Sequence, residues 1–474
     1  MHAPLAVIGG GPGGYAAAFL AADLGVDVVL VDAAPRLGGT CLLHGCIPSK
    51  ALLHVARVLS EVEELGQDWG VVFGQPDIDL AGVRARKDKV VGTLAGGLQQ
   101  LAKRRGVRVV CAHARFQDAN TLQLEGDSDS IPAGGAMTFD HAIIATGSAP
   151  IVPEPLRTAS QRVMDSEEAL RLERIPDSLL VVGGGYIGLE LGTVYARLGS
   201  RVTIVEMADR LLPAVDSDLV KHLQRRLGKL VEDRLCLNTR VLEMVDRAAG
   251  VEVTLQDSAS QRVEEFDAVL VAVGRRAVTQ HLGLEKTRVQ LDSLGFIQCD
   301  RQQRTAEPHI LAVGDVAGEP MLAHKAAHQA RTAIDVIQGK PTEFDKRAIP
   351  AVIFTDPEIA WAGLTEQQAA AANRRVESAL FPWAASGRAQ ATGRTDGLTK
   401  WLIDPDSNQL VGCGIVGVGA GELISEAVLA IEMGCEVADV SHSVHPHPTL
   451  SETLMNAAEV FSGTALEIYK PRRR

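Results

Sequence analysis

The sequence predicts an α/β fold with two Rossmann-like dinucleotide-binding units and a smaller C-terminal α+β domain. Residues 4–32 and 178–206 each show an apolar strand, a glycine turn, a helix and a second strand. After residue 349 the pattern changes to hairpin-like strands followed by an amphipathic helix. A chain of 474 residues is long enough for about three domains. Its 46 glycines and 4% aromatic residues suit an α/β protein with many tight turns.

The first unit, PLAVIGGGPGGYAAAFLAADLGVDVVLVD at residues 4–32, contains a G-x-G-x-x-G turn formed by Gly9, Gly11 and Gly14. Glycines in such a turn let the backbone approach a pyrophosphate, whose charge is stabilised by amide groups at the helix N-terminus. Asp32 ends the second strand, where a carboxylate accepts hydrogen bonds from ribose hydroxyls. This unit therefore predicts a dinucleotide site.

The second unit, SLLVVGGGYIGLELGTVYARLGSRVTIVE, repeats the turn with Gly183, Gly185 and Gly188 and ends at Glu206. In both units the acid lies 23 residues after the first glycine. One glycine turn alone also fits a plain strand–helix connection, but two complete copies with matched acids predict two dinucleotides. Glu206 repels a 2′-phosphate and no arginine stands at the strand end, so we expect NAD rather than NADP at the second site.

Three further strands are consistent with a flavin. FDHAIIATGSAP and FDAVLVAVGRR each consist of an acid, an apolar strand and then a glycine, at Gly147 and Gly274. In HILAVGDVAG, an apolar strand is followed by Asp315, an acid that could bind the ribityl chain of a flavin. The following MLAHKAAHQA is expected to start a helix that points at the flavin ring. Each of these strands alone also fits an ordinary strand end.

The segment GGTCLLHGCIPSK at residues 38–50 places Cys41 and Cys46 close together. A zinc site needs two more ligands, and only His44 lies nearby, so we expect no metal. A structural disulfide across so short a loop adds little stability. A redox-active dithiol remains the favoured interpretation, and a helix beginning near Cys46 would lower the pKa of its thiol. The five other cysteines are expected to be buried free thiols.

The location of the protein is predicted from its N-terminus and its cysteines. MHAPLAVIGGG enters an apolar strand at once, without the basic region of a signal peptide. No apolar run approaches the roughly 20 residues of a membrane span. The net charge of −12 argues against binding nucleic acid. We therefore expect a cytoplasmic protein with no membrane and no nucleic-acid partner.

GGTCLLHGCIPSK, together with a distal His-Pro-Thr, resembles the active-site segment of the flavin-dependent pyridine nucleotide–disulfide oxidoreductases, and the resemblance covers nearly the whole chain. It implies FAD at the first unit and NAD at the second. It implies that Cys46 faces the flavin and Cys41 exchanges with the substrate disulfide. Lys50 and Glu190 resemble the pair beside the flavin nitrogen that receives hydride. The sequence departs from the family at Leu43 and His44, where Asn and Val are usual, and in GRRAVT, which lacks the usual Pro-Asn.

SVHPHPTLSETL contains two candidate bases, His445 and His447, two residues apart and so on one side if the segment is an extended strand. Thiol–disulfide exchange needs a base to deprotonate the attacking thiol, and histidine suits that pH range. The residues alone do not rank the two; the resemblance selects His447, with Glu452 orienting its ring. Thr449-x-x-Glu452 also fits a capping box, so a structural role for Glu452 stays open. His445 is expected to pack locally.

The resemblance also implies the organisation of the chain. We expect an FAD-binding domain at 1–150, an NAD-binding domain at 151–275, a central segment at 276–348 that completes the FAD domain, and an interface domain at 349–474. TKWLIDPDSNQLVGCGIVG predicts a hairpin and AGELISEAVLAIEMG a helix that ends at a glycine. The resemblance further implies a homodimer with composite active sites, in which the base reaches the dithiol of the other subunit.

Within the family the chain resembles the NAD-dependent enzymes that oxidise protein-bound dihydrolipoamide, so lipoyl-bearing proteins of 2-oxo-acid dehydrogenase or glycine cleavage complexes are the expected partners. A diaphorase-type quinone reductase of the same superfamily and a non-catalytic dinucleotide-binding scaffold are the alternatives. The candidate catalytic residues are Cys41, Cys46, His447, Glu452, Lys50 and Glu190. The candidate cofactor-binding residues are Gly9, Gly11, Gly14, Asp32, Gly147, Asp315, Gly183, Gly185, Gly188, Glu206 and Gly274.

Overall fold

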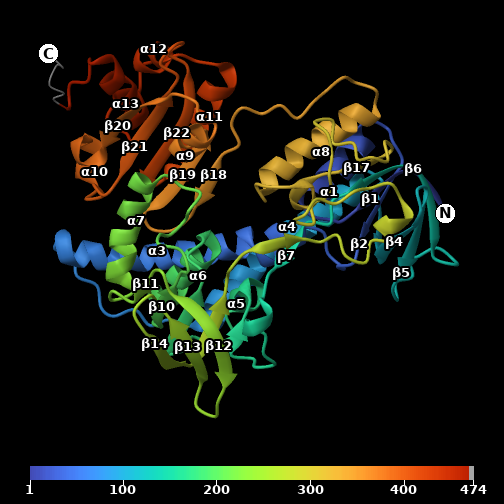
Figure 1. Ribbon diagram of the computed structural model, residues 1–474, viewed down its shortest axis with the longest axis horizontal. Helices are drawn as coiled ribbons and strands as arrows, with labels where there is room; N and C mark the ends of the chain where they lie inside the picture. The colour runs from blue at the N-terminus through green and yellow to red at the C-terminus, as the bar shows by residue number, and fades with distance from the viewer. Residues whose placement is uncertain (469–474) are drawn as a thin grey trace.

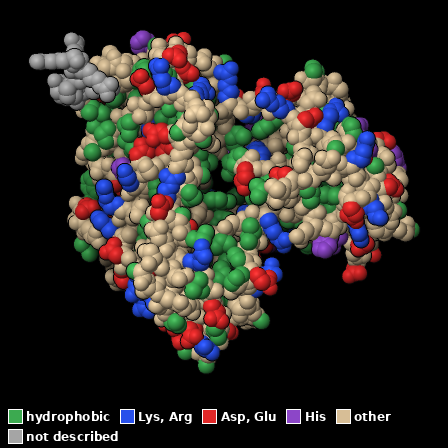
Figure 2. All heavy atoms as spheres, viewed as in Figure 1, with side chains coloured by type: hydrophobic (Ala, Val, Ile, Leu, Met, Phe, Trp, Pro, Cys, Tyr) green, Lys and Arg blue, Asp and Glu red, His purple; other side chains and the backbone are tan. Residues whose placement is uncertain are grey.

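The computed structural model describes residues 1–468 and confirms the predicted α/β class. Three units surround the long helix α3 (Cys46–Asp68), with the N-terminal unit at the right of Figure 1, the second unit below and the C-terminal domain at the upper left. The space-filling view shows a hollow between these units on the same face (Figure 2).

The N-terminal unit is built on a seven-stranded sheet in the order β3-β2-β1-β6-β5-β4, with β17 also paired to β6. Its strands are β1 (His2–Ile8), β2 (Val28–Asp32), β3 (Arg108–Cys111), β4 (His113–Asp118), β5 (Thr121–Glu125), β6 (Ala136–Ile144) and β17 (Ile310–Ala312). The pairs among β1, β2, β3, β6 and β17 are parallel. β17 therefore brings a late part of the sequence back to the first sheet.

Both faces of this sheet are buried, as the continuous apolar strands require. Leu5 and Val7 point to one face, where α1 (Pro12–Asp23) and α8 (Ala323–Ile337) cover them. Ala6 and Ile8 point to the other face, which packs against residues 282–297 and the antiparallel strands. The helix predicted from MLAHKAAHQA is thus present as α8.

The second unit repeats this plan with a five-stranded parallel sheet in the order β11-β10-β9-β15-β8. Its elements are β8 (Val163–Met164), α5 (Ser166–Arg171), β9 (Ser178–Val182), α6 (Tyr186–Arg197), β10 (Arg201–Val205), α7 (Ser217–Leu230), β11 (Leu235–Cys236) and β15 (Ala268–Val271). A three-stranded antiparallel sheet covers it, formed by β12 (Arg240–Asp246), β13 (Val251–Gln256) and β14 (Gln261–Phe266). The ribbon of β7 (Ser148–Pro150) and β16 (Arg275–Ala277) joins the two units.

The C-terminal domain has a five-stranded antiparallel sheet in the order β18-β19-β22-β21-β20. Its strands are β18 (Ala351–Ile353), β19 (Glu358–Gly363), β20 (Glu377–Pro382), β21 (Leu398–Ile403) and β22 (Leu410–Gly417). Its helices are α9 (Glu366–Ala371), α10 (Gly387–Ala391), α11 (Ala420–Met433), α12 (Val437–Ser441) and α13 (Glu452–Ser462). The predicted hairpin is confirmed as β21 and β22, and the predicted helix as α11, which ends at Gly434 in the left-handed region.

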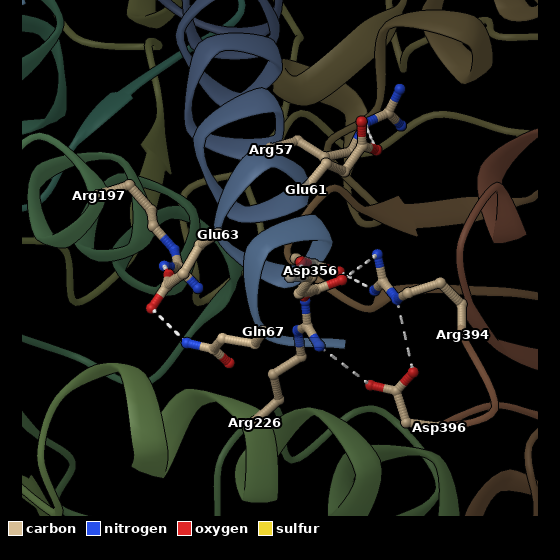
Figure 3. Close-up of polar contacts among 10 residues, drawn as sticks. Arg57, Glu61, Glu63, Gln67, Arg197, Arg226, Asp356, Arg394 and Asp396 are labelled. Atoms are coloured by element: carbon tan, nitrogen blue, oxygen red, sulfur yellow. Dashed lines mark hydrogen bonds and ion pairs between the residues drawn. The ribbon is translucent and has the colours of Figure 1, made fainter. Parts of the chain in front are cut away.

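Charged side chains connect the three units around α3, which packs against α6 and α4 (Leu80–Arg104). Arg226 of α7 pairs at 2.6 Å with Asp356 of the C-terminal domain (Figure 3). It also pairs with Glu64 of α3. Arg394 also pairs with Asp356. Lys400, fully buried in β21, makes a second link, 2.8 Å from Asp216 at the start of α7. These contacts fix the second unit against both others.

Residues 1–468 include no helix that is long and apolar enough to cross a membrane. In the same part of the chain, no three His, Cys, Asp or Glu side chains form a group that could hold a metal ion.

Candidate active site

One cavity of about 430 Å³ joins most of the predicted site residues of the first unit. It extends from the glycine turn to the dithiol and to the start of α8, whose Ala323 and Ala326 line it. The predicted residues on its wall are Gly9, Gly11, Asp32, Cys41, Cys46, Gly147, Asp315, Lys50 and Glu190. Its lining residues reach no further along the chain than Ala326.

The glycine turn at one end of the cavity has no room for a side chain at Gly9 or Gly14. Gly9 has φ +107°, and a Cβ there would overlap the carbonyl oxygen of Ala145 at the end of β6. A Cβ on Gly14 would overlap the carbonyl oxygen of Gly9, so α1 packs directly on the strand that precedes it. The turn thus lies where β1 meets β6, and the N-terminus of α1 faces the cavity, as binding of a pyrophosphate requires.

Asp32 secures this turn from the next strand. Its carboxylate accepts hydrogen bonds from the backbone N–H of Gly10 and, at 2.6 Å, from that of Ala34. Burial raises the pKa of Asp32, and these two donors oppose the shift. The carboxylate lines the cavity, where it keeps acceptor capacity for the hydroxyls of a ribose.

Asp315 lies on another part of the same wall and is held by a hydrogen-bond chain. The hydroxyl of Ser148 donates to Asp315 at 2.5 Å. Arg275 donates to the Ser148 hydroxyl at 2.8 Å and to its carbonyl oxygen at 2.7 Å. Gly147, with φ +73°, has no atom near its missing Cβ and leaves the space open.

The dithiol lies where α3 begins. Cys46 is the first residue of α3 and Cys41 lies in α2 (Gly39–His44), as free thiols. The hydrogen bond from Cys41 lowers the pKa of Cys46 to about 7, against desolvation by the surrounding protein and with help from the charge of Lys50. The same interaction, together with burial, raises the pKa of Cys41. Of the two thiols, Cys46 therefore loses its proton more readily.

Lys50 and Glu190 meet beside the Cys46 thiol. The Lys50 ammonium lies 2.8 Å from Glu190, whose side chain is buried in α6 of the second unit. The backbone N–H of Phe354 donates to the other oxygen of Glu190 at 2.9 Å, and the Phe354 ring lies 4.5 Å below the ammonium. The pair is thus held from all three units.

The predicted NAD-binding residues form a second, separate turn with the same construction. A Cβ on Gly183 would overlap the carbonyl oxygen of Ala272, and one on Gly188 would overlap that of Gly183. Glu206 accepts from the N–H of Gly184 at 2.6 Å and from that of Ala208 at 2.8 Å, as Asp32 does in the first unit. Gly185 faces open space.

Gly274, at φ +144°, follows β15. Its carbonyl oxygen accepts a hydrogen bond from the N–H of Ile151, next to the ribbon that joins the two units.

These residues fit the two cofactors. The first unit provides a helix N-terminus flanked by glycines, a strand-end acid, a second acid and a low-pKa thiol along one cavity, which together match the parts of FAD. When bound there, FAD supplies a two-electron carrier between the dithiol and NAD. The second turn provides the helix N-terminus and acid that a nicotinamide dinucleotide requires.

The two histidines lie in the C-terminal domain, away from this cavity. His447 Nδ1 lies 2.8 Å from one oxygen of Glu452, and the other oxygen accepts from the N–H of Thr449 at 2.7 Å. Glu452 therefore both orients the ring and holds the turn. The segment is not an extended strand, so the two histidines do not share one side. The His447 side chain is 77% exposed, whereas that of His445 is only 7% exposed.

Several residues of the site were not predicted. Ser148 and Arg275 hold Asp315, but a serine and an arginine at strand ends carry no distinctive spacing. Phe354 contacts Lys50 and Glu190 only because β18 ends beside them. Tyr186 lines the cavity from the start of α6, directly after the second glycine turn, and its aromatic ring next to that turn was the one available signal.

Known proteins resemble this chain over nearly its whole length. A family profile described as pyridine nucleotide-disulphide oxidoreductase matches residues 3–330, and the dimerisation-domain profile of the same family matches residues 349–458. Curated proteins named dihydrolipoyl dehydrogenase are 45% identical in Vibrio cholerae, over 99% of this chain and 97% of theirs, and 42% identical in Halobacterium salinarum, over 98% and 97%.

Solved structures show the same architecture. LpdA from Mycobacterium tuberculosis superposes with a TM-score of 0.87 at 27% identity, over 96% of this chain and 99% of its own. The HOCl-induced flavoprotein disulfide reductase RclA from Escherichia coli superposes with a TM-score of 0.82 at 26% identity, over 95% and 98%. The profiles and the full-length relatives together show that this chain belongs to the pyridine nucleotide-disulphide oxidoreductase family, as an NAD-dependent flavoprotein enzyme that uses FAD.

Proposed function

We propose that this enzyme is a dihydrolipoyl dehydrogenase, which oxidises protein-bound dihydrolipoamide and passes the electrons to NAD. The observation that carries the proposal is the Cys41–Cys46 dithiol, with its low-pKa thiol next to Lys50 and Glu190 on the wall of the FAD cavity. The full-length relatives bear that name. Lipoyl-bearing proteins of 2-oxo-acid dehydrogenase or glycine cleavage complexes are the proposed partners.

In the proposed reaction the oxidised enzyme holds a Cys41–Cys46 disulfide. His447 takes the proton from one thiol of dihydrolipoamide, and the resulting thiolate attacks the sulfur of Cys41, so that Cys46 leaves as a thiolate. The second lipoyl thiol then attacks the mixed disulfide, which releases lipoamide and leaves Cys41 as a thiol. The pair now holds two electrons, which NAD finally accepts as a hydride.

The arrangement of His447 suits this role. Glu452 accepts the hydrogen on Nδ1, which leaves Nε2 as the free acceptor for a substrate proton. The exposed ring lies in the segment matched by the dimerisation profile. We therefore propose a homodimer in which His447 of one subunit serves the Cys41 of the other.

We also propose the division of the chain into an FAD domain at 1–150 completed by 276–348, an NAD domain at 151–275 and an interface domain at 349–474. The return of β17 to the first sheet and the separate second sheet support it. A cytoplasmic location is proposed because the seven cysteines are all free thiols.

The proposal is tested by Cys41→Ser and by a comparison of acceptors. The purified enzyme is assayed with dihydrolipoamide, glutathione and a quinone, each coupled to NAD(H). We expect dihydrolipoamide to give the highest kcat/KM, and Cys41→Ser to abolish it while the quinone reaction continues. A variant that still oxidises dihydrolipoamide would contradict the role of the dithiol, and a preference for the quinone would favour the diaphorase alternative.

A further inference from the structure

The turn that carries His447 has little support from its own backbone. Between Ser443 and Thr449, no main-chain hydrogen bond to another described residue fixes the chain. Pro446 and Pro448 have no N–H to donate. A turn of this kind is held in place by its side chains.

His445 supplies the main anchor of this turn. Its Nδ1 lies 2.8 Å from the carbonyl oxygen of Ser443, and its Nε2 lies 2.8 Å from Glu426. Both partners are acceptors, so both bonds form fully only when each ring nitrogen carries a hydrogen. The His445 side chain is only 7% exposed. The His445 ring therefore holds the turn in place through these two contacts.

Glu426 lies on a rigid element. It belongs to α11, which packs against β19 and β22 of the central sheet. Its charge acts on the buried Cys413 of β22, whose pKa is raised first by burial and then by this carboxylate. The contact from His445 to Glu426 thus ties the turn to the core of the C-terminal domain.

Each of the two histidines pairs with an acid, but the two rings differ in exposure. The His445 side chain is 7% exposed and pairs with Glu426, whereas that of His447, two residues later, is 77% exposed and pairs with Glu452. The hydroxyl of Thr449 donates to the carbonyl oxygen of Pro446 at 2.7 Å and closes the turn between the two pairs. A shift of His445 is therefore passed to His447 through a short, proline-restricted segment.

We infer that His445, through its bond to Glu426, is a positioning residue that sets the place of the His447 ring for proton transfer. This inference rests on the proposed function of His447 as the base. A general base must lie within hydrogen-bond reach of the proton it removes, and a displacement of about 1 Å costs roughly 100-fold in rate.

The test compares His445→Ala, Glu426→Ala and Glu426→Gln with His447→Gln in the FAD-containing enzyme. The control is His442→Gln, at an exposed position of the same segment. Each variant is assayed with dihydrolipoamide and NAD, and with NADH and ferricyanide, a reaction that needs no thiol base. The pH profile of kcat for dihydrolipoamide is recorded with each.

For His445→Ala and Glu426→Ala we expect about 10- to 100-fold lower kcat with dihydrolipoamide, an altered pH profile, and ferricyanide rates within about twofold of the parent. A double variant that combines His445→Ala with Glu426→Ala should lose no more activity than either single variant, because both substitutions remove the same bond. Glu426→Gln keeps an acceptor oxygen and should retain most of the activity. His442→Gln should behave as the parent.

Two failures are distinguishable. If His447→Gln lowers dihydrolipoamide turnover but neither Ala variant does, His445 does not position the base and the inference is overturned. If His447→Gln itself leaves turnover unchanged, the proposed base is wrong. If His445→Ala does not fold, the inference is tested by Glu426→Ala and Glu426→Gln instead. An equal loss of rate in the ferricyanide and dihydrolipoamide reactions would mean that the contact has a structural role alone, and would overturn the inference.

Discussion

The ammonium of Lys50 lies 2.8 Å from Glu190, which is 140 residues away in sequence and only 3% exposed. Lys50 belongs to α3 and Glu190 to α6 of the second unit, and Phe354 of the C-terminal domain donates to the same carboxylate. The ion pair beside the dithiol is therefore a meeting point of three units. Its position depends on how all three pack.

This pair predicts an unequal response to its two single substitutions. Lys50→Met leaves a buried carboxylate with one hydrogen bond, a change that costs about 3 kcal/mol. Glu190→Gln leaves a lysine that is 31% exposed and so partly hydrated, which costs roughly 1 kcal/mol. Thermal unfolding should show a larger fall of the midpoint for Lys50→Met. Equal unfolding midpoints for the two variants would mean that another group compensates the charge of Glu190 when Lys50 is replaced.

The dithiol predicts a pH-dependent reactivity that Cys41 controls. The pKa of Cys46 is lowered to about 7, chiefly by the hydrogen bond from Cys41. Because the thiolate is the nucleophile, alkylation of the reduced enzyme by iodoacetamide should rise with pH around 7 and modify Cys46. Cys41→Ala removes the donor, so the midpoint should move upward. Mass spectrometry of the alkylated peptide measures both effects, and an unchanged midpoint would contradict the hydrogen bond as the cause.

In the second glycine turn, alanine substitutions of Gly185 and Gly188 should have different effects. Gly185 has φ −79° and open space at its missing Cβ, so Gly185→Ala should keep the stability of the protein. Its methyl group would instead occupy the approach of the dinucleotide, and KM for NAD should rise at least about tenfold. Gly188→Ala would push α6 off its strand and lower the unfolding midpoint. Calorimetry and NAD titrations separate the two, and a destabilised Gly185→Ala would refute the distinction.

Asp356 predicts an acid-sensitive link between the units. Burial raises its pKa, but Arg394 and Arg226 outweigh that effect and hold the pKa below its usual value. A depressed pKa stabilises the fold above the unfolded value, near 3.9, and this contribution is lost as the pH falls through the folded value. Asp356→Asn should therefore cost about 3 kcal/mol at pH 7, and its difference from the parent should shrink below about pH 4. Urea titrations at both pH values provide the measurement.

Sequence reasoning succeeded where function depends on local spacing. The two glycine turns, the acids that follow them and the helix start at Cys46 are all set within about 30 residues, and each is where the pattern predicted. The contact of Phe354 with Glu190, and the anchor from His445 to Glu426, depend on packing between elements and have no local pattern. Two histidines at i and i+2 suggested a common side, but prolines turned the segment and separated them.

The contacts at the two ends of helix α3 limit the insertions and deletions that this helix can tolerate. It begins at Cys46, carries Lys50 at the start of its second turn and Glu64 just before its last turn, and spans 23 residues, roughly 35 Å. One residue inserted or deleted between those ends would rotate one end by about 100° against the other. Glu64 would then leave Arg226, or Lys50 would leave Glu190. The number of residues in this helix is therefore as constrained as the identity of the cysteine that starts it.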